Sequence, residues 1–246
     1  MKKFGVQHFT FRPLANEEGL FPVLSDVADM GYTGVEFCFF GGFDSLGMSA
    51  KEFSSRLSEL GLKFIGNHFT RAMFNGSHEE AFAYIAQAGG KYAAYNIWGD
   101  YNTVDDISAA AEYLNGLSKI AKREGLSLLY HNHAAEFAEL DGRLIIDRLF
   151  DELDDNVYLE ADVFFIAEKG VDVYDYLKTN QKRIRTVHLK QMGKDGTSVD
   201  IPDGIIDMKK VIELLPYATD YIVEEASPDS DIRLSLKRNA EFLKAL

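Results

Sequence analysis

The sequence predicts an α/β fold, a (β/α)8 TIM barrel formed by a single domain over residues 1–246. Short runs rich in β-branched and aromatic residues alternate eight times with stretches of helical periodicity. The strands recur roughly every thirty residues, which is the length of one βα unit. Near-continuous apolar strands such as LSLLY and YIV indicate burial on both faces, as parallel strands require. Eight such units are the number that closes this barrel.

The eight strands are expected at residues 4–9, 33–37, 63–68, 92–98, 126–131, 157–162, 184–189 and 220–224. The chain has only 5 prolines and lacks a linker-like or low-complexity run, so one domain is expected. A doubly wound open sheet is the alternative. It lacks its usual support, because no G-x-G-x-x-G follows the first strand.

Helix signals separate the strands. From Asp105 to Arg123 the apolar residues recur at helical spacing, and Gly125 is expected to end this helix. Ser49 and Ser77 each precede a glutamate by three residues, which is the spacing of a capping box. Helices are therefore expected to begin directly after these two serines.

Composition limits the classes of function. The net charge of −13 argues against a nucleic-acid partner, because phosphate binding depends on Lys and Arg. Cys38 is the single cysteine and lies in an apolar stretch, which fits a buried residue in a reducing, cytoplasmic protein. The chain shows neither a signal peptide nor a run long enough for a membrane span. Apolar helix faces would allow a homodimer.

Histidines and carboxylates gather where the predicted strands end: His8, Glu36, His68, His131, His133, Asp162, His188 and Glu224. In a parallel barrel these strand ends meet at one face, where catalytic residues collect. Imidazole and carboxylate groups, with no cysteine in reach, suit one divalent ion such as Mn²⁺, Zn²⁺, Co²⁺ or Mg²⁺. The sequence therefore predicts a metal site at this face.

Two strand ends carry pairs of polar residues on one face, because side chains two apart point the same way. His131 and His133 form one pair, a ligand or acid/base arrangement that Glu136 could extend; packing histidines would give the same pattern. In the other pair Asp162 is the expected ligand. Glu160, one layer deeper, would either orient a ligand or be a buried structural acid.

His188 and Lys190 also share a face. The imidazole could bind the ion, and the ammonium could hold an anionic substrate oxygen or point to solvent. Glu224 ends the last strand, whereas Glu225 faces the other way.

The remaining candidates are substrate contacts. Glu36 and His68 could meet substrate hydroxyls, and His8 is a weaker candidate because phenylalanines surround it. Trp98, with phenylalanines in the same loops, would stack on a sugar ring or simply pack.

The ordered motifs resemble the xylose isomerase-like TIM-barrel superfamily, specifically its sugar phosphate isomerase/epimerase branch. The segments that carry the resemblance are FGVQHFTFRP, GYTGVEF, YHNHAAEF, LEADVFFIAEKGVDV, VHLK, DGIIDMKKVIELL and IVEEAS. The resemblance implies one divalent ion held by a residue from each of strands five to eight. Asp162, His188 and Glu224 match that pattern, while His131 stands where the epimerases have a glutamate, with Glu136 nearby.

The resemblance implies an isomerase or epimerase that abstracts a proton next to the carbonyl of a keto-sugar or polyol derivative. Glu224 or one of the pair His131 and His133 would be the base. A dehydratase or lyase on an inositol-derived or keto-sugar is the alternative, and a catalytically inactive sugar- or partner-binding barrel is another. Gln191 and Phe165 replace an aspartate and a histidine of most relatives, which argues against a two-metal site. A DNA-cleaving relative of endonuclease IV would need a basic face, against the net charge of −13.

Overall fold

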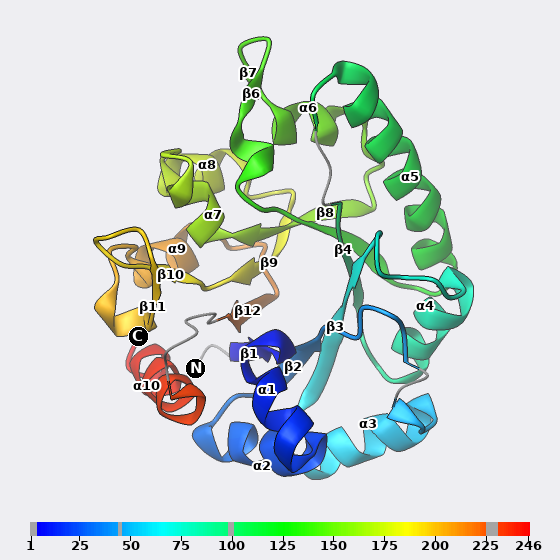
Figure 1. The fold of residues 1–246 in the computed structure, drawn as a ribbon, viewed down its shortest axis with the longest axis vertical. Coiled ribbons are helices and arrows are strands. Elements are labelled where there is room, and N and C mark those ends of the chain that lie inside the picture. Colours follow the sequence, from blue (N-terminus) through cyan, green and yellow to red (C-terminus); the bar gives the residue numbers. More distant parts are fainter. Residues whose placement is uncertain (1–3, 44–45, 98–100, 225–230) are drawn as a thin grey trace.

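The computed structural model describes residues 4–43, 46–97, 101–224 and 231–246. Its parallel strands close into a barrel in the order β1-β12-β9-β8-β5-β4-β3-β2, and helices surround them (Figure 1). The barrel strands are β1 Phe4–Gln7, β2 Gly34–Phe37, β3 Lys63–Thr70, β4 Tyr92–Asn96, β5 Ser127–His131, β8 Val157–Asp162, β9 Ile184–His188 and β12 Asp220–Val223. The (β/α)8 prediction is confirmed.

Five strand ends differ from the predicted ones: those of β1, β3 and β4 by two residues, and those of β9 and β12 by one. The first strand stops at Gln7, and His8 begins a helix because the Gln7 side chain caps it by accepting a hydrogen bond from the Phe9 N–H. The prediction that His8 ends a strand was therefore wrong. β4 ends at Asn96 rather than at residue 98, and Trp98 lies outside the described residues.

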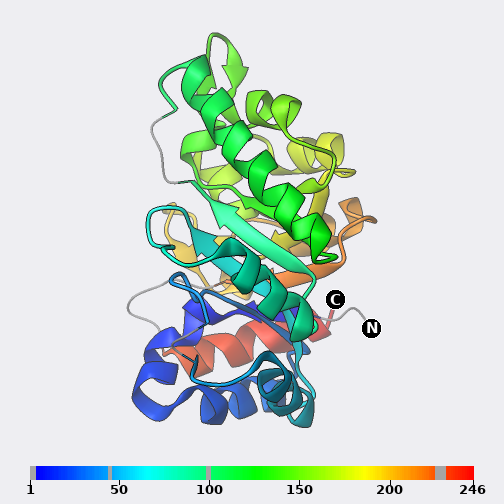
Figure 2. The same ribbon diagram turned by 90° about the vertical axis from the view of Figure 1, so that its right-hand side faces the viewer.

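The helices are α1 His8–Glu18, α2 Leu20–Met30, α3 Ala50–Glu59, α4 His78–Gln87, α5 Val104–Arg123, α6 Ile145–Glu152, α7 Val163–Glu168, α8 Val173–Asn180, α9 Met208–Leu214 and α10 Ile232–Lys244. Ser49 and Ser77 cap α3 and α4 as predicted, each accepting a hydrogen bond from the backbone N–H three residues on. A complete capping box precedes α5, formed by Thr103 and Asp106. Figure 2 shows α3, α4 and α5 along the outside of the barrel.

Apolar side chains fill the end of the barrel opposite the strand carboxyl ends. A small interior cluster contains Ile65, Tyr92, Ala94, Leu129 and Ile222. A Cβ at Gly5 would lie 2.4 Å from Ile65 Cδ1, so this glycine makes room for the isoleucine. The packed layer closes this end and leaves the polar strand ends to face the other.

Gly66 on β3 provides a test of barrel packing. A Cβ at this position would lie 2.4 Å from the Tyr92 carbonyl oxygen, and backbone cannot easily shift. We expect Gly66→Ala to lower the free energy of unfolding by about 1–3 kcal/mol, the usual cost of overpacking. Gly116→Ala is the control, because Gly116 is exposed within α5 and has open space around its Cα. This change should raise stability by about 0.5–1 kcal/mol. Urea unfolding that gave both variants the same stability would contradict the packing.

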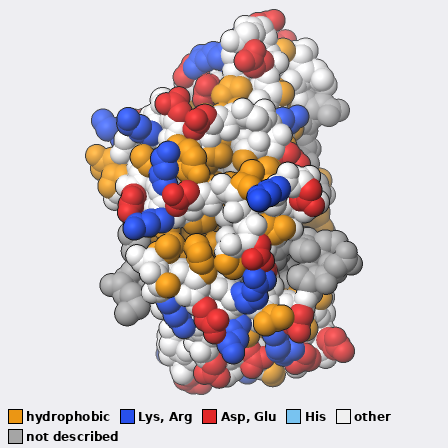
Figure 3. All heavy atoms as spheres, turned by 90° about the vertical axis from the view of Figure 1, so that its left-hand side faces the viewer, with side chains coloured by type: hydrophobic (Ala, Val, Ile, Leu, Met, Phe, Trp, Pro, Cys, Tyr) orange, Lys and Arg blue, Asp and Glu red, His pale blue; other side chains and the backbone are white. Residues whose placement is uncertain are grey.

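The surface carries charges of both signs. On the face seen in Figure 3, acidic and basic side chains are interspersed with hydrophobic ones. This face offers no basic patch of the kind that nucleic acids require. In the part of the chain that the structure describes, none of the helices has the length and hydropathy to cross a bilayer. The homodimer and the cytoplasmic location stay predictions.

Candidate metal centre and active-site pocket

The strand register divides the predicted ring of ligands between two depths. His131 lies beside Glu160 in the β5–β8 ladder, whereas Asp162 lies beside His188 in the β8–β9 ladder. His131 therefore lies one layer below Asp162. Two groups of side chains that could hold an ion result, and they share His188.

The outer group consists of Asp162, His188 and Glu224, whose ligand atoms all lie within 4.8 Å of one another. Asp162 and His188 are fully buried, and the Glu224 side chain is 12% exposed. His188 Nδ1 lies 2.7 Å from Glu224 Oε2. These three residues come from the ends of β8, β9 and β12, so the closure of the barrel assembles the group.

Glu36 holds the other side of the His188 ring. Its Oε2 lies 2.8 Å from His188 Nε2 and accepts a hydrogen bond of 2.7 Å from the Gln7 side-chain amide. A carboxylate behind a ligating imidazole fixes the ring and its tautomer. Burial lowers the pKa of His188, but the surrounding carboxylates of Glu160, Glu224 and Glu36 outweigh it and hold this pKa well above its ordinary value.

The inner group consists of His68, His131, Glu160 and the shared His188, all of them buried. Glu160 contacts His68 Nε2 and accepts a hydrogen bond of 2.6 Å from the Thr186 hydroxyl. His131 Nδ1 lies 3.4 Å from the same carboxylate. His68 and Glu160 thus pair with each other, whereas His131 Nδ1, like Asp162 Oδ2, has no hydrogen-bond partner among the described residues. The inner group lies directly beneath the outer one.

Asp162 shows that a cation fits the outer group. Its Oδ1 caps α7 by accepting a hydrogen bond of 2.9 Å from the Phe164 N–H, while its buried Oδ2 has no hydrogen-bond partner. Such an oxygen loses its hydration without compensation. Burial raises the pKa of Asp162 from 3.8 to about 7; the Lys190 ammonium opposes this rise, and the Glu224 carboxylate adds to it. A divalent ion would supply the missing partner.

Metal affinity should depend on pH because protons compete for the same atoms. Below a pH of about 7 the Asp162 carboxyl holds a proton in the metal-free protein, and binding must displace it. We expect the association constant for Zn²⁺ to fall about tenfold per pH unit for each proton that binding releases, from Asp162 below a pH of about 7 and also from the His188 ring, whose pKa is held high. Titration calorimetry in buffers of different ionisation enthalpy measures both quantities. An affinity that stays constant from pH 6 to pH 8 would contradict this competition.

A pocket of 160 Å³ opens beside the outer group. Its described walls are Gln7, Phe9, Cys38, Phe40, His68, Asn96, His131, His133, Phe165, Lys190 and Glu224. Glu224 is the one carboxylate among these described residues. The Lys190 ammonium lies 3.4 Å from Glu224 Oε1 and 4.8 Å from the centre of the Phe165 ring. The pocket thus combines one carboxylate, one ammonium and three imidazoles.

The structure brings seven of the predicted site residues together at the pocket or directly behind it. His68, His131, His133, Lys190 and Glu224 line the pocket, and Asp162 and His188 lie directly behind it. Glu36 is fully buried under His188, which places it too deep for the predicted contact with a substrate hydroxyl. Trp98 and Glu225 lie outside the described residues.

Two further predicted contacts lie away from this pocket. His8 lines a neighbouring cleft instead. The Glu136 carboxylate accepts hydrogen bonds of 2.6 Å from the Tyr130 hydroxyl and 3.0 Å from the His133 N–H. It belongs to neither group of candidate ligands. Glu136 therefore fixes the chain after β5, a role that the sequence pattern did not indicate.

Gln191 also has a structural role. Its amide donates to the carbonyls of Ile201 and Ile206 and accepts from the N–H groups of Met192 and Ile206. All four contacts hold the segment after β9, which includes the hairpin of β10 Gln191–Met192 and β11 Ser198–Val199. The residue that differs from the family pattern thus stabilises a loop and is not among the described walls of the pocket.

Comparison with known proteins identifies the family. A family model described as a xylose isomerase-like TIM barrel matches residues 24–246. The chain belongs to this family. It is 22% identical, with a TM-score of 0.85, to a sugar phosphate isomerase/epimerase from Parabacteroides distasonis, covering 100% of this chain and 99% of the other. The IOLI protein, solved with a zinc atom, is 14% identical, with a TM-score of 0.73 and coverage of 99% and 97%. At these identities the two structures show the fold alone.

Curated relatives with higher identity match shorter regions. An inosose dehydratase from Clostridium perfringens is 37% identical over 92 residues, which are 37% of this chain and 30% of that protein. An inosose dehydratase from Geobacillus thermodenitrificans is 31% identical over 151 residues, a match that covers 53% of this chain and 50% of that protein. The matches therefore span half or less of these relatives' own length.

Proposed function

We propose that this protein is a metal-dependent dehydratase of a keto-sugar or keto-polyol, which removes a proton next to the carbonyl and then expels water. One observation carries this proposal: Glu224, the one carboxylate among the described walls of the pocket, belongs to the candidate metal centre and lies 3.4 Å from the Lys190 ammonium. A base and an acid thus face the same small space.

Asp162, His188 and Glu224 would hold the ion, leaving room for substrate oxygens as catalytic sites with three protein ligands do. Such an ion supplies Lewis acidity, which favours charge on the carbonyl oxygen. Zn²⁺ is the first ion to test, because the similarly folded IOLI protein was solved with zinc. Mn²⁺, Co²⁺ and Mg²⁺ also match the imidazole and carboxylate ligands.

Glu224 is the proposed base. Burial raises the pKa of its carboxyl, but the Lys190 ammonium and the His188 ring outweigh burial and hold the pKa well below its ordinary value. The carboxylate is therefore ionised at neutral pH. It takes the proton from the carbon next to the carbonyl, and the electrons of that C–H bond move toward the carbonyl oxygen.

Lys190 is the proposed acid. As the electrons return, the bond to the hydroxyl on the next carbon breaks, and the ammonium gives its proton to that oxygen to form water. Glu224 then returns its proton to the Lys190 amine across the 3.4 Å contact. Both groups regain their starting states, and the net products are an unsaturated ketone and water.

Epimerisation is the second candidate, and the resemblance to sugar phosphate isomerase/epimerases favours it. Epimerisation needs a base on each face of the substrate. Here the second base would have to be a histidine of the pocket, such as His133, and burial makes this imidazole a weak base by lowering its pKa to about 4. Elimination needs the single carboxylate and the ammonium that the pocket offers, and the curated relatives are named as dehydratases.

The deciding experiment uses the metal-loaded protein and a 2-keto-inositol in D₂O. Elimination yields a product one water lighter, with the ultraviolet absorbance of a conjugated ketone. Epimerisation yields an isomer of unchanged composition that carries deuterium next to the carbonyl. If neither change occurs with this ketone or with a panel of ketohexoses while a full equivalent of metal is bound, the result supports a binding protein and overturns the proposal.

His133→Ala separates the two reactions further. Elimination by Glu224 and Lys190 should be largely unaffected, whereas epimerisation should slow by about 10²–10⁴-fold, the range for losing a positioned acid or base. The His133 ring packs 4.8 Å from the Phe165 ring, so Phe165→Leu controls for lost packing. Rates of product formation and of deuterium uptake are compared. If uptake persists while inversion stops, His133 is the returning base of an epimerase; unchanged turnover would contradict a role in either reaction.

A further inference from the structure

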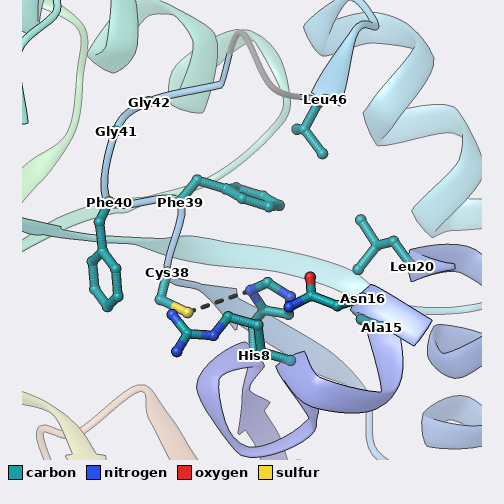
Figure 4. A pocket seen from close by; sticks show the side chains of 11 residues that line it. His8, Ala15, Asn16, Leu20, Cys38, Phe39, Phe40, Gly41, Gly42 and Leu46 are labelled. Atoms are coloured by element: carbon teal, nitrogen blue, oxygen red, sulfur yellow. Dashed lines mark hydrogen bonds between the residues drawn. The ribbon is translucent and has the colours of Figure 1, made fainter. Parts of the chain in front are cut away.

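A second cleft adjoins the pocket on the side of α1 and the segment after β2. It has a volume of 630 Å³, and Figure 4 shows Phe39, Phe40, Cys38 and His8 around it. Cys38 and Phe40 are walls of both spaces. The pocket and the cleft are therefore direct neighbours, with these two residues at their common boundary.

The pocket alone is small for a ligand site. Its 160 Å³ is below the range of about 300–1,000 Å³ that small-molecule sites have, whereas the 630 Å³ of the cleft lies within it. A substrate that places its carbonyl beside Glu224 can extend past Cys38 and Phe40 toward the larger cleft. The two spaces together suit a substrate with a substituent away from the reacting carbon.

Arg12 sets the charge of the cleft. It is the one charged side chain among the described walls, since burial lowers the pKa of His8 to about 4 and raises the pKa of Cys38 to about 12. The guanidinium lies 4.6 Å from the centre of the Phe9 ring and 6.0 Å from that of Phe40. These rings belong to the pocket, so the guanidinium stands at its boundary with the cleft.

Arg12 also lacks an ion-pair partner among the residues that the structure describes. Other arginines of this acidic chain do pair: Arg233 with Glu18 and Asp26, and Arg238 with Asp200 and Asp203. In a protein of net charge −13, a half-buried guanidinium without a carboxylate is a ready partner for an anionic ligand. Its planar N–H groups match a carboxylate or a phosphate.

Building on the proposed keto-sugar chemistry, we propose that the cleft is a second substrate subsite. Arg12 there binds an anionic group, a carboxylate or a phosphate, that the substrate carries away from its reacting carbonyl. Phe39 and Phe40 cover the carbon skeleton between the two ends. The substrate class is thus an acidic keto-sugar, such as a uronate-type or a phosphorylated one.

Calorimetric titration with glucose, glucuronate and glucose 6-phosphate tests this subsite without requiring turnover. We expect at least one of the two anions to bind about 10–100-fold more tightly than glucose, as hydrogen bonds to a charged group do. The anion that gains affinity distinguishes a carboxylate from a phosphate subsite. The preference should persist in the metal-free protein, because Arg12 is not among the candidate ligands.

Arg12→Gln should remove this preference and leave glucose binding unchanged, whereas Arg12→Lys should keep part of it. Arg123→Gln is the control, since it makes the same change in net charge at a side chain on α5 that is 66% exposed. Equal affinities for all three sugars in the wild type, or an equal loss for all three in Arg12→Gln, would overturn the subsite. Anion preference without loss of water from any ketone would overturn only the proposed reaction, and loss of water without anion preference would overturn only the subsite.

Discussion

Glu224→Gln is expected to abolish proton exchange between substrate and solvent. Glutamine keeps the size of the side chain but cannot take a proton, and the lowered pKa of Glu224 means that the wild-type carboxylate is ready to do so at neutral pH. Losing a positioned base alone costs about 10²–10⁴-fold in rate. Because Glu224 also belongs to the candidate metal centre, the decrease in rate on replacing it should exceed that range. Deuterium uptake next to the carbonyl, followed by NMR in D₂O, is the measurement.

Metal content must be measured in the same samples, since Glu224→Gln can act through either role. A variant that keeps a full equivalent of metal and loses exchange assigns the proton transfer to Glu224. Glu168→Gln, the same change at an exposed position at the end of α7, should exchange like the wild type. Persistent exchange in metal-loaded Glu224→Gln would place the base elsewhere, with His133 the next residue to test.

The barrel could be predicted from sequence because its signals are local. Strands buried on both faces read as short apolar runs, and serines mark the starts of α3 and α4. The eight strands and the family followed from these patterns. The early end of β1 could not be predicted from these patterns, because it depends on the Gln7 side chain, which caps the next helix.

The depth of each site residue could not be predicted in the same way. Strand ends were expected to form one ring, but the strands of a barrel are staggered relative to one another. The register places His131 beside Glu160 and Asp162 beside His188, which sends His131 to the inner group. A pattern within one strand carries no information about this stagger.

Buried partners were equally hidden from sequence. Glu36 and His188 are 152 positions apart in the chain, yet they hydrogen-bond in the interior. The pattern marked both as polar residues at strand ends, which fits a substrate contact as well as a support for a ligand. Only the closed barrel shows that Glu36 stands behind His188 rather than in the pocket, held there by the amide of Gln7, which is itself a wall of the pocket. The same closure brings Arg12 to the edge of the pocket, a residue that strand-end reasoning passed over.

Asp162→Asn should remove the metal and, at the same time, stabilise the metal-free protein. The substitution takes away the charge of a proposed ligand, so affinity for Zn²⁺ should fall by more than the ~10–100-fold that loss of a residue behind a ligand costs. Glu36→Gln changes a residue behind His188, so it should lower the affinity for Zn²⁺ only within that smaller range. Asp172→Asn is the control for capping, because Asp172 caps α8 as Asp162 caps α7 but belongs to neither group of candidate ligands.

The stability effect has the opposite sign from the metal effect. Burial raises the pKa of Asp162 from 3.8 to about 7, so the folded protein binds an extra proton between these values, and its stability falls as pH rises through them. Above a pH of about 7 the wild type therefore buries an unsatisfied carboxylate that the variant lacks. We expect metal-free Asp162→Asn to be more stable there by about 1–3 kcal/mol, with the gap closing toward pH 4. Chemical unfolding of both proteins with and without Zn²⁺ measures this difference. If Asp162→Asn is less stable than the wild type at pH 8 and still binds zinc normally, Asp162 is not a ligand, because on this proposal bound zinc compensates for burying the Asp162 carboxylate.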